Sequence, residues 1–263
     1  VPYNNQNNLP NFNTVKTPFF YDQLFALNIF NGFDRVQNAN QASFGIHTHI
    51  NREDTGANIF DFNVGAAYYI TPPEVCLSTN CTEAKKHFSP IASNASIHLT
   101  KHWAINASYA YDPALNVINN ATTSLHYQSD PQHVLNLGYG YVQSGRASLS
   151  GLLDPYAPPG SASTNFTAPT SSLLFSFAWP IMRKWSTLGA VNYDIANQRL
   201  ETLYAGLSYN TCCWAIRFVA ERAYLSTTNT NGGLQNNFNN SYFVELTLKG
   251  LGSYGDNHLE SRL

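Results

Sequence analysis

Apolar and polar residues alternate along most of the chain from Asn40 onward, in segments of about ten residues. A two-residue period gives a β-strand one apolar and one polar face, and about ten residues is the length that a tilted strand needs to cross a bilayer. The pattern predicts roughly eleven strands, near residues 40–50, 57–70, 93–100, 103–111, 119–128, 133–143, 170–180, 185–195, 199–210, 213–224 and 240–250. Residues 1–39 lack the alternation, so we expect mostly loop there, with a short helix around Asp22 to Phe30 and a C-terminal tail at 251–263.

The connections between these segments are expected to alternate in length. Short ones are predicted at 51–56, 101–102, 129–132, 181–184 and 211–212, and longer ones at 71–92, 112–118, 144–169 and 225–239. The connection at 196–198 is an exception, because it is short where a long one is expected. Short turns on one rim and long loops on the other are typical of an outer-membrane barrel. We therefore predict an all-β, transmembrane, antiparallel fold over residues 40–250.

Four tryptophans lie beside the predicted short turns, at Trp103, Trp179, Trp185 and Trp214. Indole rings prefer the boundary between water and hydrocarbon, so these side chains predict an aromatic girdle on the periplasmic rim. Tryptophans scattered through a soluble core would not select one rim. In the last predicted strand we assign one face to lipid and the other to the lumen: Tyr242, Val244, Leu246 and Leu248 against Glu245, Thr247 and Lys249.

Composition favours membrane strands over a soluble domain. Charged residues make up 11% of the chain, against roughly 25% in soluble domains, while aromatic residues reach 14%. The net charge of −2 argues against nucleic acid as a partner, because proteins that bind it concentrate basic surface. No apolar run approaches the roughly 20 residues of a membrane helix. The chain opens on Val1 without a signal peptide, so we expect a processed or cut product.

The four cysteines fall into two pairs. Cys76 and Cys81 lie in the first long loop, and Cys212 and Cys213 lie in a short turn. The predicted topology separates the pairs by an apolar band about 25 Å tall, which a disulfide cannot span. We expect a local Cys76–Cys81 bridge, with two unpaired loop thiols as the alternative. For Cys212 and Cys213 we expect no partner within this chain, and a ring closed between such neighbours would be cramped.

Three stretches of the sequence resemble one family. The first runs from Leu203-Tyr204-Ala205-Gly206-Leu207-Ser208-Tyr209 into Cys212-Cys213-Trp214-Ala215-Ile216-Arg217. The second comprises Val1-Pro2-Tyr3, Gln6, Pro10, Leu24-Phe25, Asn28, Phe30, Gly32, Asp34-Arg35 and Asn38-Ala39-Asn40-Gln41, and the third is Glu245-Leu246-Thr247-Leu248-Lys249-Gly250-Leu251. Together they resemble the LPS-assembly protein LptD, formerly called organic-solvent-tolerance protein. The resemblance covers most of this chain but only the C-terminal part of such a protein.

The resemblance implies a role in lipopolysaccharide transport. Members of that family take lipopolysaccharide from periplasmic bridge proteins and insert it into the outer leaflet of the Gram-negative outer membrane, with the plug lipoprotein LptE in the barrel lumen. By the same resemblance, Cys212 and Cys213 bond to cysteines of an N-terminal periplasmic region that is absent from this sequence.

The resemblance also makes the last strand one lip of a lateral gate, formed by Tyr242, Phe243, Val244, Glu245, Leu246, Thr247 and Leu248. Roughly eleven strands are too few for the family's barrel, and an odd count is atypical of bacterial barrels. We expect the chain alone to form an open, curved sheet with two unpaired edges. Such a sheet should neither insert stably nor move lipid.

Asp34-Arg35 is the charged pair that stands out in the N-terminal segment. It could fold a loop back into the lumen through a charge-assisted contact, or it could be a solvated surface pair worth under about 1 kcal/mol. Ile29 stands where the resembling family usually has a basic residue, which weakens any lipid A phosphate contact at that point.

The sequence nominates no catalytic residues, no cofactor and no metal site, and we expect no enzyme. His47 and His49 share a strand face, but a third ligand is missing, so polar lumen lining is the better interpretation. No nucleophile-elbow motif occurs. A passive outer-membrane porin or a surface adhesin barrel, with residues 144–169 as its constriction or ligand loop, is the alternative function. A secreted β-sandwich that binds carbohydrate is a third possibility.

Overall fold

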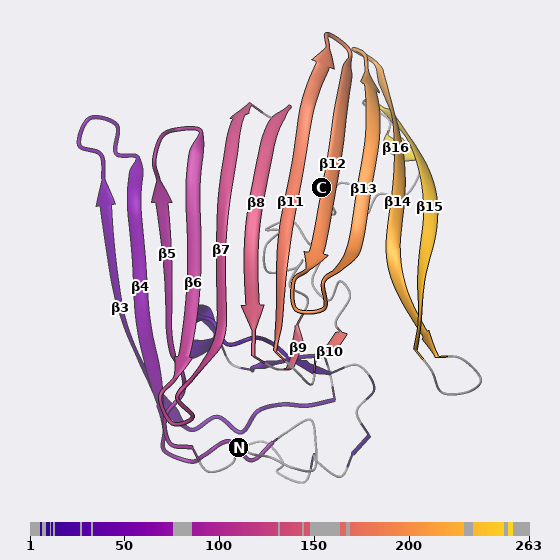
Figure 1. Cartoon of the computed structure of the whole chain (residues 1–263). Coiled ribbons are helices and arrows are strands. Elements are labelled where there is room, and N and C mark those ends of the chain that lie inside the picture. The colour runs from indigo at the N-terminus through magenta and orange to yellow at the C-terminus, as the bar shows by residue number, and fades with distance from the viewer. Residues whose placement is uncertain are drawn as a thin grey trace.

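The structure is a computed structural model, and it describes residues 6, 9–10, 12, 14–26, 28–32, 34–75, 86–130, 132–143, 145–147, 164–166, 169–228, 234–249 and 252–254. Most of these residues belong to one antiparallel sheet of 12 strands, which runs from β3 at one edge to β16 at the other (Figure 1). The two edge strands do not pair with each other, so the sheet is open, as predicted.

Strand bounds follow the predicted segments closely. The strands are β3 (Gln41–Asn51), β4 (Asn58–Tyr69), β5 (Ile91–His98), β6 (Trp103–Asp112), β7 (Val117–Asp130), β8 (His133–Val142), β11 (Thr170–Met182), β12 (Trp185–Asp194), β13 (Arg199–Asn210), β14 (Trp214–Thr228), β15 (Leu234–Leu248) and β16 (Gly252–Tyr254). Sequence neighbours pair along the whole sheet except at β8 and β11, between which β9 (Gly145–Ala147) and β10 (Thr164–Phe166) form a sheet of their own. β16 was not predicted, because its three residues lie in the expected tail.

The register aligns the apolar positions of successive strands on one face. Ile105 pairs with Leu125, Leu125 with Leu137, and Leu137 with Phe175. Side chains on this face remain exposed although they are large and apolar, as Leu137 at 41% and Val244 at 56% illustrate. A water-soluble sheet would cover such a face, whereas a lipid-facing sheet leaves it open. The apolar residues of the alternating pattern therefore share one face of the sheet, as the sequence predicted.

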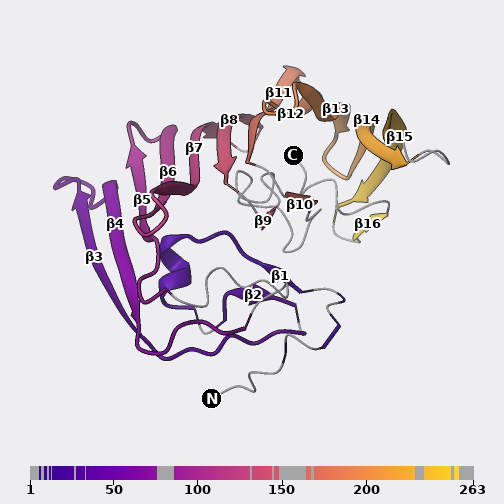
Figure 2. The same cartoon turned by 60° about the horizontal axis from the view of Figure 1, so that its bottom comes forward.

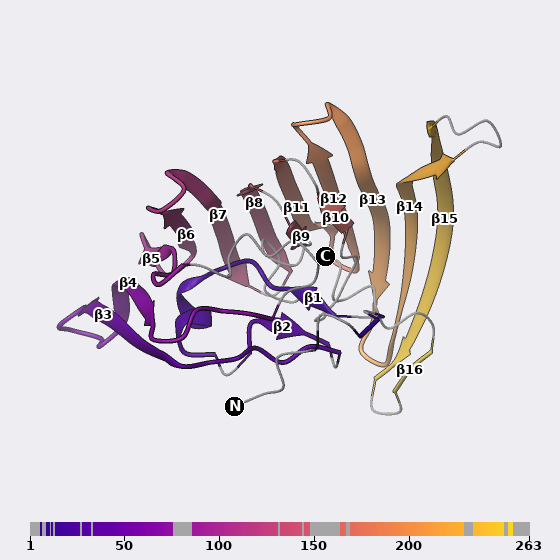
Figure 3. The ribbon, with the colours of Figure 1, turned by 90° about the horizontal axis from the view of Figure 1, so that it is seen from below.

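The opposite face is concave, and the N-terminal segment lies within its curve (Figure 2, Figure 3). A 3-10 helix, η2 (Tyr21–Leu24), presents Leu24 to Ala67, Ala92 and Ala110, where Leu24 is 1% exposed. Two short strands, β1 (Val15–Lys16) and β2 (Phe30–Asn31), pair elsewhere in the segment. No helix in the described part of the chain is long and apolar enough to cross a membrane.

The predicted helix over Asp22 to Phe30 is shorter in the structure and ends at Leu24. The side chain of Asn28 explains the break, because its Oδ1 accepts hydrogen bonds from the backbone nitrogens of Phe30 and Gln37. Asparagine side chains compete in this way with helical backbone bonds. The chain is then extended at Phe30, which pairs with Lys16.

Connection lengths differ from the prediction at two places. A long connection was predicted at 225–239, but β14 continues to Thr228 and β15 begins at Leu234, so only residues 229–233 separate them. The connection between β6 and β7 was expected to be long, but only residues 113–116 separate the two strands. Asp112 explains the tight turn, because its Oδ1 accepts hydrogen bonds from the backbone nitrogens of Ala114 and Leu115, at 3.0 and 3.2 Å. Asn116 takes a left-handed conformation with φ of 54°, which asparagine tolerates better than most residues. The strand ends that flank the connections at 70–90 and 143–169 lie on this rim, opposite the Cys212–Cys213 turn.

Candidate functional site

The Cys212–Cys213 turn joins β13 to β14 on the rim that carries the short connections (Figure 1). The backbone nitrogen of Thr211 donates to the carbonyl oxygen of Trp214 at 2.9 Å, and the Thr211 hydroxyl accepts from the Trp214 nitrogen at 3.1 Å. Lys249, at the end of β15, donates its backbone nitrogen to the Cys213 oxygen at 3.0 Å and its Nζ to Asn210 Oδ1 at 2.6 Å. The turn is therefore attached to the end of the last long strand.

Both thiols of this turn are exposed, and neither forms a disulfide within the described residues. The two Sγ atoms lie 2.9 Å apart. The hydrogen bond with Cys212 raises the pKa of the Cys213 thiol above its ordinary value, and the positive charge of Lys249 partly opposes that effect. The turn thus presents both thiol groups to solvent. Cys76 and Cys81 lie outside the described residues, so their local bridge remains a prediction.

The predicted gate strand corresponds to the C-terminal half of β15. One side of β15 pairs with β14 over its whole length, from Thr228↔Leu234 to Trp214↔Leu248. The other side pairs only with β16, through Leu246, Thr247 and Leu248. The edge of the described sheet is therefore open from Tyr242 to Glu245 but covered at the end near the Cys212–Cys213 turn. The sequence predicted that this outer edge is unpaired along its whole length, and β16 covers one end of it.

Polar contacts tie the last strands together on the concave face. Arg217 Nη1 lies 3.2 Å from Glu245 Oε2, and Glu245 is only 4% exposed. The Tyr204 hydroxyl donates to Glu221 Oε1 at 2.8 Å. Arg217 belongs to β14 and Glu245 to β15, so the ion pair links the edge strand to its neighbour. A buried carboxylate requires such a partner, because an unpaired buried charge is costly.

Asp34 and Arg35 lie in the N-terminal segment, between β2 and β3 along the chain. Arg35 is 2% exposed, and its guanidinium donates to the carbonyl oxygens of Leu9 at 2.6 Å and Asp34 at 2.9 Å. Asp34 Oδ2 accepts from the Phe12 backbone nitrogen at 3.0 Å and from the Thr14 hydroxyl at 3.2 Å. A solvated surface pair does not describe this arrangement. The two residues hold the loops of the segment in place within the concave face.

All four tryptophans lie on the short-turn rim and take part in aromatic contacts there. Trp103 and Tyr127 have ring centroids 4.6 Å apart, and Tyr127 lies 6.4 Å from Trp179. Tyr209 contacts both Trp185, at 4.9 Å, and Trp214, at 5.4 Å. Sequence analysis missed the two tyrosines, although each stands within a few residues of a predicted short turn. A search for any aromatic residue beside such turns would have found them.

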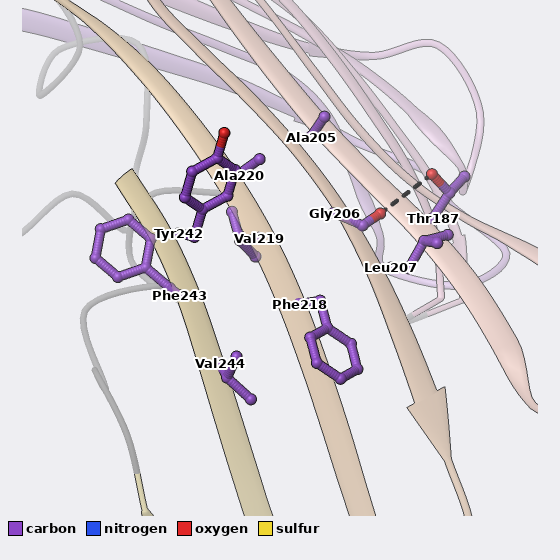
Figure 4. A pocket seen from close by; sticks show the side chains of 10 residues that line it. All are labelled: Thr187, Ala205, Gly206, Leu207, Phe218, Val219, Ala220, Tyr242, Phe243 and Val244. Atoms are coloured by element: carbon purple, nitrogen blue, oxygen red, sulfur yellow. Dashed lines mark hydrogen bonds between the residues drawn. The ribbon is translucent and has the colours of Figure 1, made fainter. Parts of the chain in front are cut away.

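A feature that the sequence did not suggest is an apolar groove on the convex face, with a volume of about 440 Å³. Its lining comes from four adjacent strands, β12 to β15 (Figure 4): Thr187, Ala205, Gly206, Leu207, Phe218, Val219, Ala220, Tyr242, Phe243 and Val244. Ala205 pairs with Ala220, and Ala220 with Tyr242. Two adjacent alanines thus leave a hollow between larger side chains, and only the register of the strands reveals it.

His47 and His49 share a strand face in the structure, as the sequence predicted. His47 Nε2 lies 3.0 Å from Asp61 Oδ2, and the His47 and His49 ring centroids are 5.4 Å apart. Over the ranges that the structure describes, no group of three or more His, Cys, Asp or Glu side chains could hold a metal ion.

Comparison with known proteins gives consistent matches to one family. The family model described as LptD, LPS transport system D, matches residues 1–185. The LPS-assembly protein LptD of Coxiella burnetii is 38% identical over 97% of this chain and 29% of its own length. The protein of the same name from Legionella pneumophila (strain Lens) is 33% identical over 96% of this chain and 30% of its own length. The chain therefore spans about 30% of the length of these curated relatives.

Among solved structures, the FrpB iron transporter from Neisseria meningitidis covers 81% of this chain, and the match covers 39% of that protein. The two are 15% identical, with a TM-score of 0.41. A likeness at that level does not establish a common fold.

Proposed function

The chain belongs to the LptD family, and from that premise we propose that it forms the C-terminal part of a barrel that inserts lipopolysaccharide into the outer leaflet of the Gram-negative outer membrane. The observation that carries the proposal is the match to LPS-assembly proteins over 97% of the chain, together with the family model over residues 1–185. A passive porin or adhesin is not favoured, because no relative reported above is one.

The geometry of the open sheet suits the transfer of an amphiphile. Its convex face is apolar and would contact hydrocarbon, while the concave face carries polar groups such as the Arg217–Glu245 pair. The β15 edge between Tyr242 and Glu245 has no strand partner among the described residues. We propose that this edge meets the first strand of the complete barrel and forms one lip of a lateral gate. Acyl chains could then pass sideways into lipid while the head group stays in polar surroundings.

The Cys212–Cys213 turn supports a covalent connection to a region outside this chain. Both thiols are exposed on the rim opposite the long connections, where the proposed orientation places the periplasm. We propose that each bonds to a cysteine of the N-terminal periplasmic region, which receives lipid from the bridge proteins. The lipoprotein LptE would occupy the concave side, and the chain would act without catalysis or a cofactor.

Reconstitution of the full-length protein tests the transport proposal. Proteoliposomes that contain the full-length protein, LptE and the bridge proteins should transfer lipopolysaccharide to their surface, measured by accessibility of the transferred lipid to an added lipid A-modifying enzyme. In matched liposomes with residues 1–263 alone, lipopolysaccharide transfer should not exceed that of empty liposomes, because an open sheet has no closed wall. Absence of transfer by the complete system would refute the proposed function, and transfer by residues 1–263 alone would refute the need for the missing strands.

A further inference from the structure

The groove on the convex face is a shallow channel floored by small residues. Ala205 and Ala220 are register partners on β13 and β14, and the next row toward the Cys212–Cys213 turn holds Leu207 and Phe218. At the β15 end, Tyr242 closes the row of alanines and is 81% exposed (Figure 4). Because this face contacts hydrocarbon in the proposed orientation, the natural content of such a channel is an acyl chain of a membrane lipid.

One guanidinium stands at the end of the groove that points away from the Cys212–Cys213 turn. Arg222 lies two residues beyond Ala220 on the same face of β14 and is exposed. Its guanidinium carbon lies 4.2 Å from the centroid of the Phe238 ring, and Phe238 pairs with Tyr224, one step further toward the long connections. The side chain therefore leans toward that rim. Within the described residues no carboxylate forms an ion pair with Arg222.

Strand geometry places this guanidinium near the outer boundary of the membrane. Trp214 marks the aromatic rim at the start of β14, and Arg222 follows it by eight residues. At about 3.4 Å per residue this is about 27 Å of strand, or about 20 Å of height for a strand tilted by about 40°. The apolar band of such barrels is about 25 Å tall. An arginine whose stem lies at that height extends its charged end to the interface, where lipid phosphates are found.

We propose that β13–β15 form a docking site for one phosphorylated lipid on the outer wall of the sheet, with an acyl chain over Ala205 and Ala220 and the phosphate on Arg222. The lipid is lipopolysaccharide, which would reach this wall directly after release at the neighbouring β15 edge; this identification rests on the proposed function. Charge complementarity and the adjacency of groove, guanidinium and edge strand favour it, since Arg binds phosphate through paired N–H donors.

A photocrosslinking titration on the full-length protein tests the site. Tyr242→p-benzoylphenylalanine puts a reactive ring of similar shape at the end of the groove, and the purified, delipidated protein is titrated with bisphosphorylated lipid A or with its dephosphorylated form. The phosphorylated lipid should reach half-maximal crosslinking at about tenfold lower concentration, as one charge-assisted contact allows. Arg222→Gln should abolish that difference, whereas Arg183→Gln, the same change at an exposed turn on the opposite rim, should preserve it.

The groove is tested separately with apolar substitutions. Ala220→Leu fills the channel and should lower crosslinking to both lipids, whereas Ala66→Leu, on the same face of the distant strand β4, should not. Equal behaviour of Arg222→Gln and Arg183→Gln, or of Ala220→Leu and Ala66→Leu, would overturn the docking site. Equally strong crosslinking by phosphatidylethanolamine would overturn lipopolysaccharide as its occupant.

The reconstitution described above separates this inference from the proposed function. If the complete system delivers lipopolysaccharide but crosslinking does not depend on Arg222, the docking site is wrong and the transport function stands. If crosslinking behaves as expected but delivery fails, the site stands as a lipid site and the proposed function is wrong.

Discussion

At each end of the sheet, a cluster of small residues lies where something approaches the sheet closely, and the two clusters are on opposite faces. Near β3–β6 the cluster lies on the concave side under the N-terminal segment, and near β12–β15 it lies in the groove on the convex side: Gly45, Gly65, Ala67, Ala92 and Ala110 at the first end, and Ala205 and Ala220 at the second. At the first end they admit the chain's own N-terminal segment. At the second end they leave the groove that we assign to lipid. Small side chains in a membrane sheet thus indicate where something outside the sheet approaches it closely.

The concave face of the sheet is filled by different parts of the chain at the two ends. At β4–β6 it is filled from outside the sheet by Leu24, which is 1% exposed. At β12–β15 it is filled by the strands themselves, where Leu188 and Val219 pack with Phe243. The stability of the first end should therefore depend on the N-terminal segment, and the stability of the second end on contacts between adjacent strands.

The largest effect should come from removing the side chain that fills the first end. Leu24→Ala leaves a cavity against Ala67 and Ala92 and should lower the free energy of unfolding of the full-length protein by about 2 to 5 kcal/mol. Urea unfolding in lipid vesicles, followed by the electrophoretic mobility of the folded barrel, measures the change. Leu9→Ala is the control, because Leu9 is 54% exposed. Similar losses for both variants would show that the N-terminal segment does not fill the sheet.

At the second end, the largest loss of stability should come from breaking the ion pair between β14 and β15. Arg217→Gln leaves the Glu245 carboxylate, 4% exposed, without its guanidinium, and should cost about 3 kcal/mol. Adding Glu245→Gln should recover part of the loss, since it removes the unpaired charge. The control is Arg52→Gln, because the Arg52–Asp54 pair is solvated and 3.9 Å long and is worth under about 1 kcal/mol. Equal costs for the two single variants in the same unfolding assay would contradict the argument.

A smaller effect tests how closely the N-terminal segment approaches the sheet. A Cβ at Gly65 would press on the Phe44 carbonyl oxygen and lie 2.9 Å from Leu24 Cδ1, so Gly65→Ala should cost about 1 to 3 kcal/mol. A Cβ at Gly45 would lie 2.5 Å from the Tyr21 hydroxyl oxygen, but that side chain can turn aside. Gly45→Ala should therefore lower the free energy of unfolding by less than Gly65→Ala. The measurement is the loss of the folded band in electrophoresis as the temperature is raised. The reverse order would place the rigid contact at Gly45.

The sequence predicted the strands of this sheet because a two-residue period survives wherever one face meets lipid. It also located the Cys212–Cys213 turn, since the alternation breaks there and resumes at Trp214. It did not predict β16, because three residues are too few for a period to be recognised. Nor did it predict the short connection after Asp112, which depends on a side-chain oxygen that caps two backbone nitrogens.

The features that escaped prediction depend on which strands are neighbours. Ala205 and Ala220 form a groove only because the register sets them side by side, and nothing in either strand alone marks the site. In the same way, the composition of residues 1–39 gives no sign that Leu24 fits against Ala67. Contacts of this kind depend on the register and curvature of the sheet, and the alternation of residues along one strand does not encode either.

The smallest effect tests whether the second end is held by its own strands. Tyr204→Phe removes the hydrogen bond to Glu221, 2.8 Å long, which joins β13 to β14 on the concave face. The loss should be about 1 kcal/mol, the usual net contribution of one hydrogen bond, in the same urea titration. Tyr193→Phe is the matched control, because Tyr193 is 37% exposed on the convex face. If Tyr193→Phe lowers the free energy of unfolding as much as Tyr204→Phe, the hydrogen bond on the concave face adds nothing particular to the stability of this end. The difference between the two ends would then rest on the N-terminal segment alone.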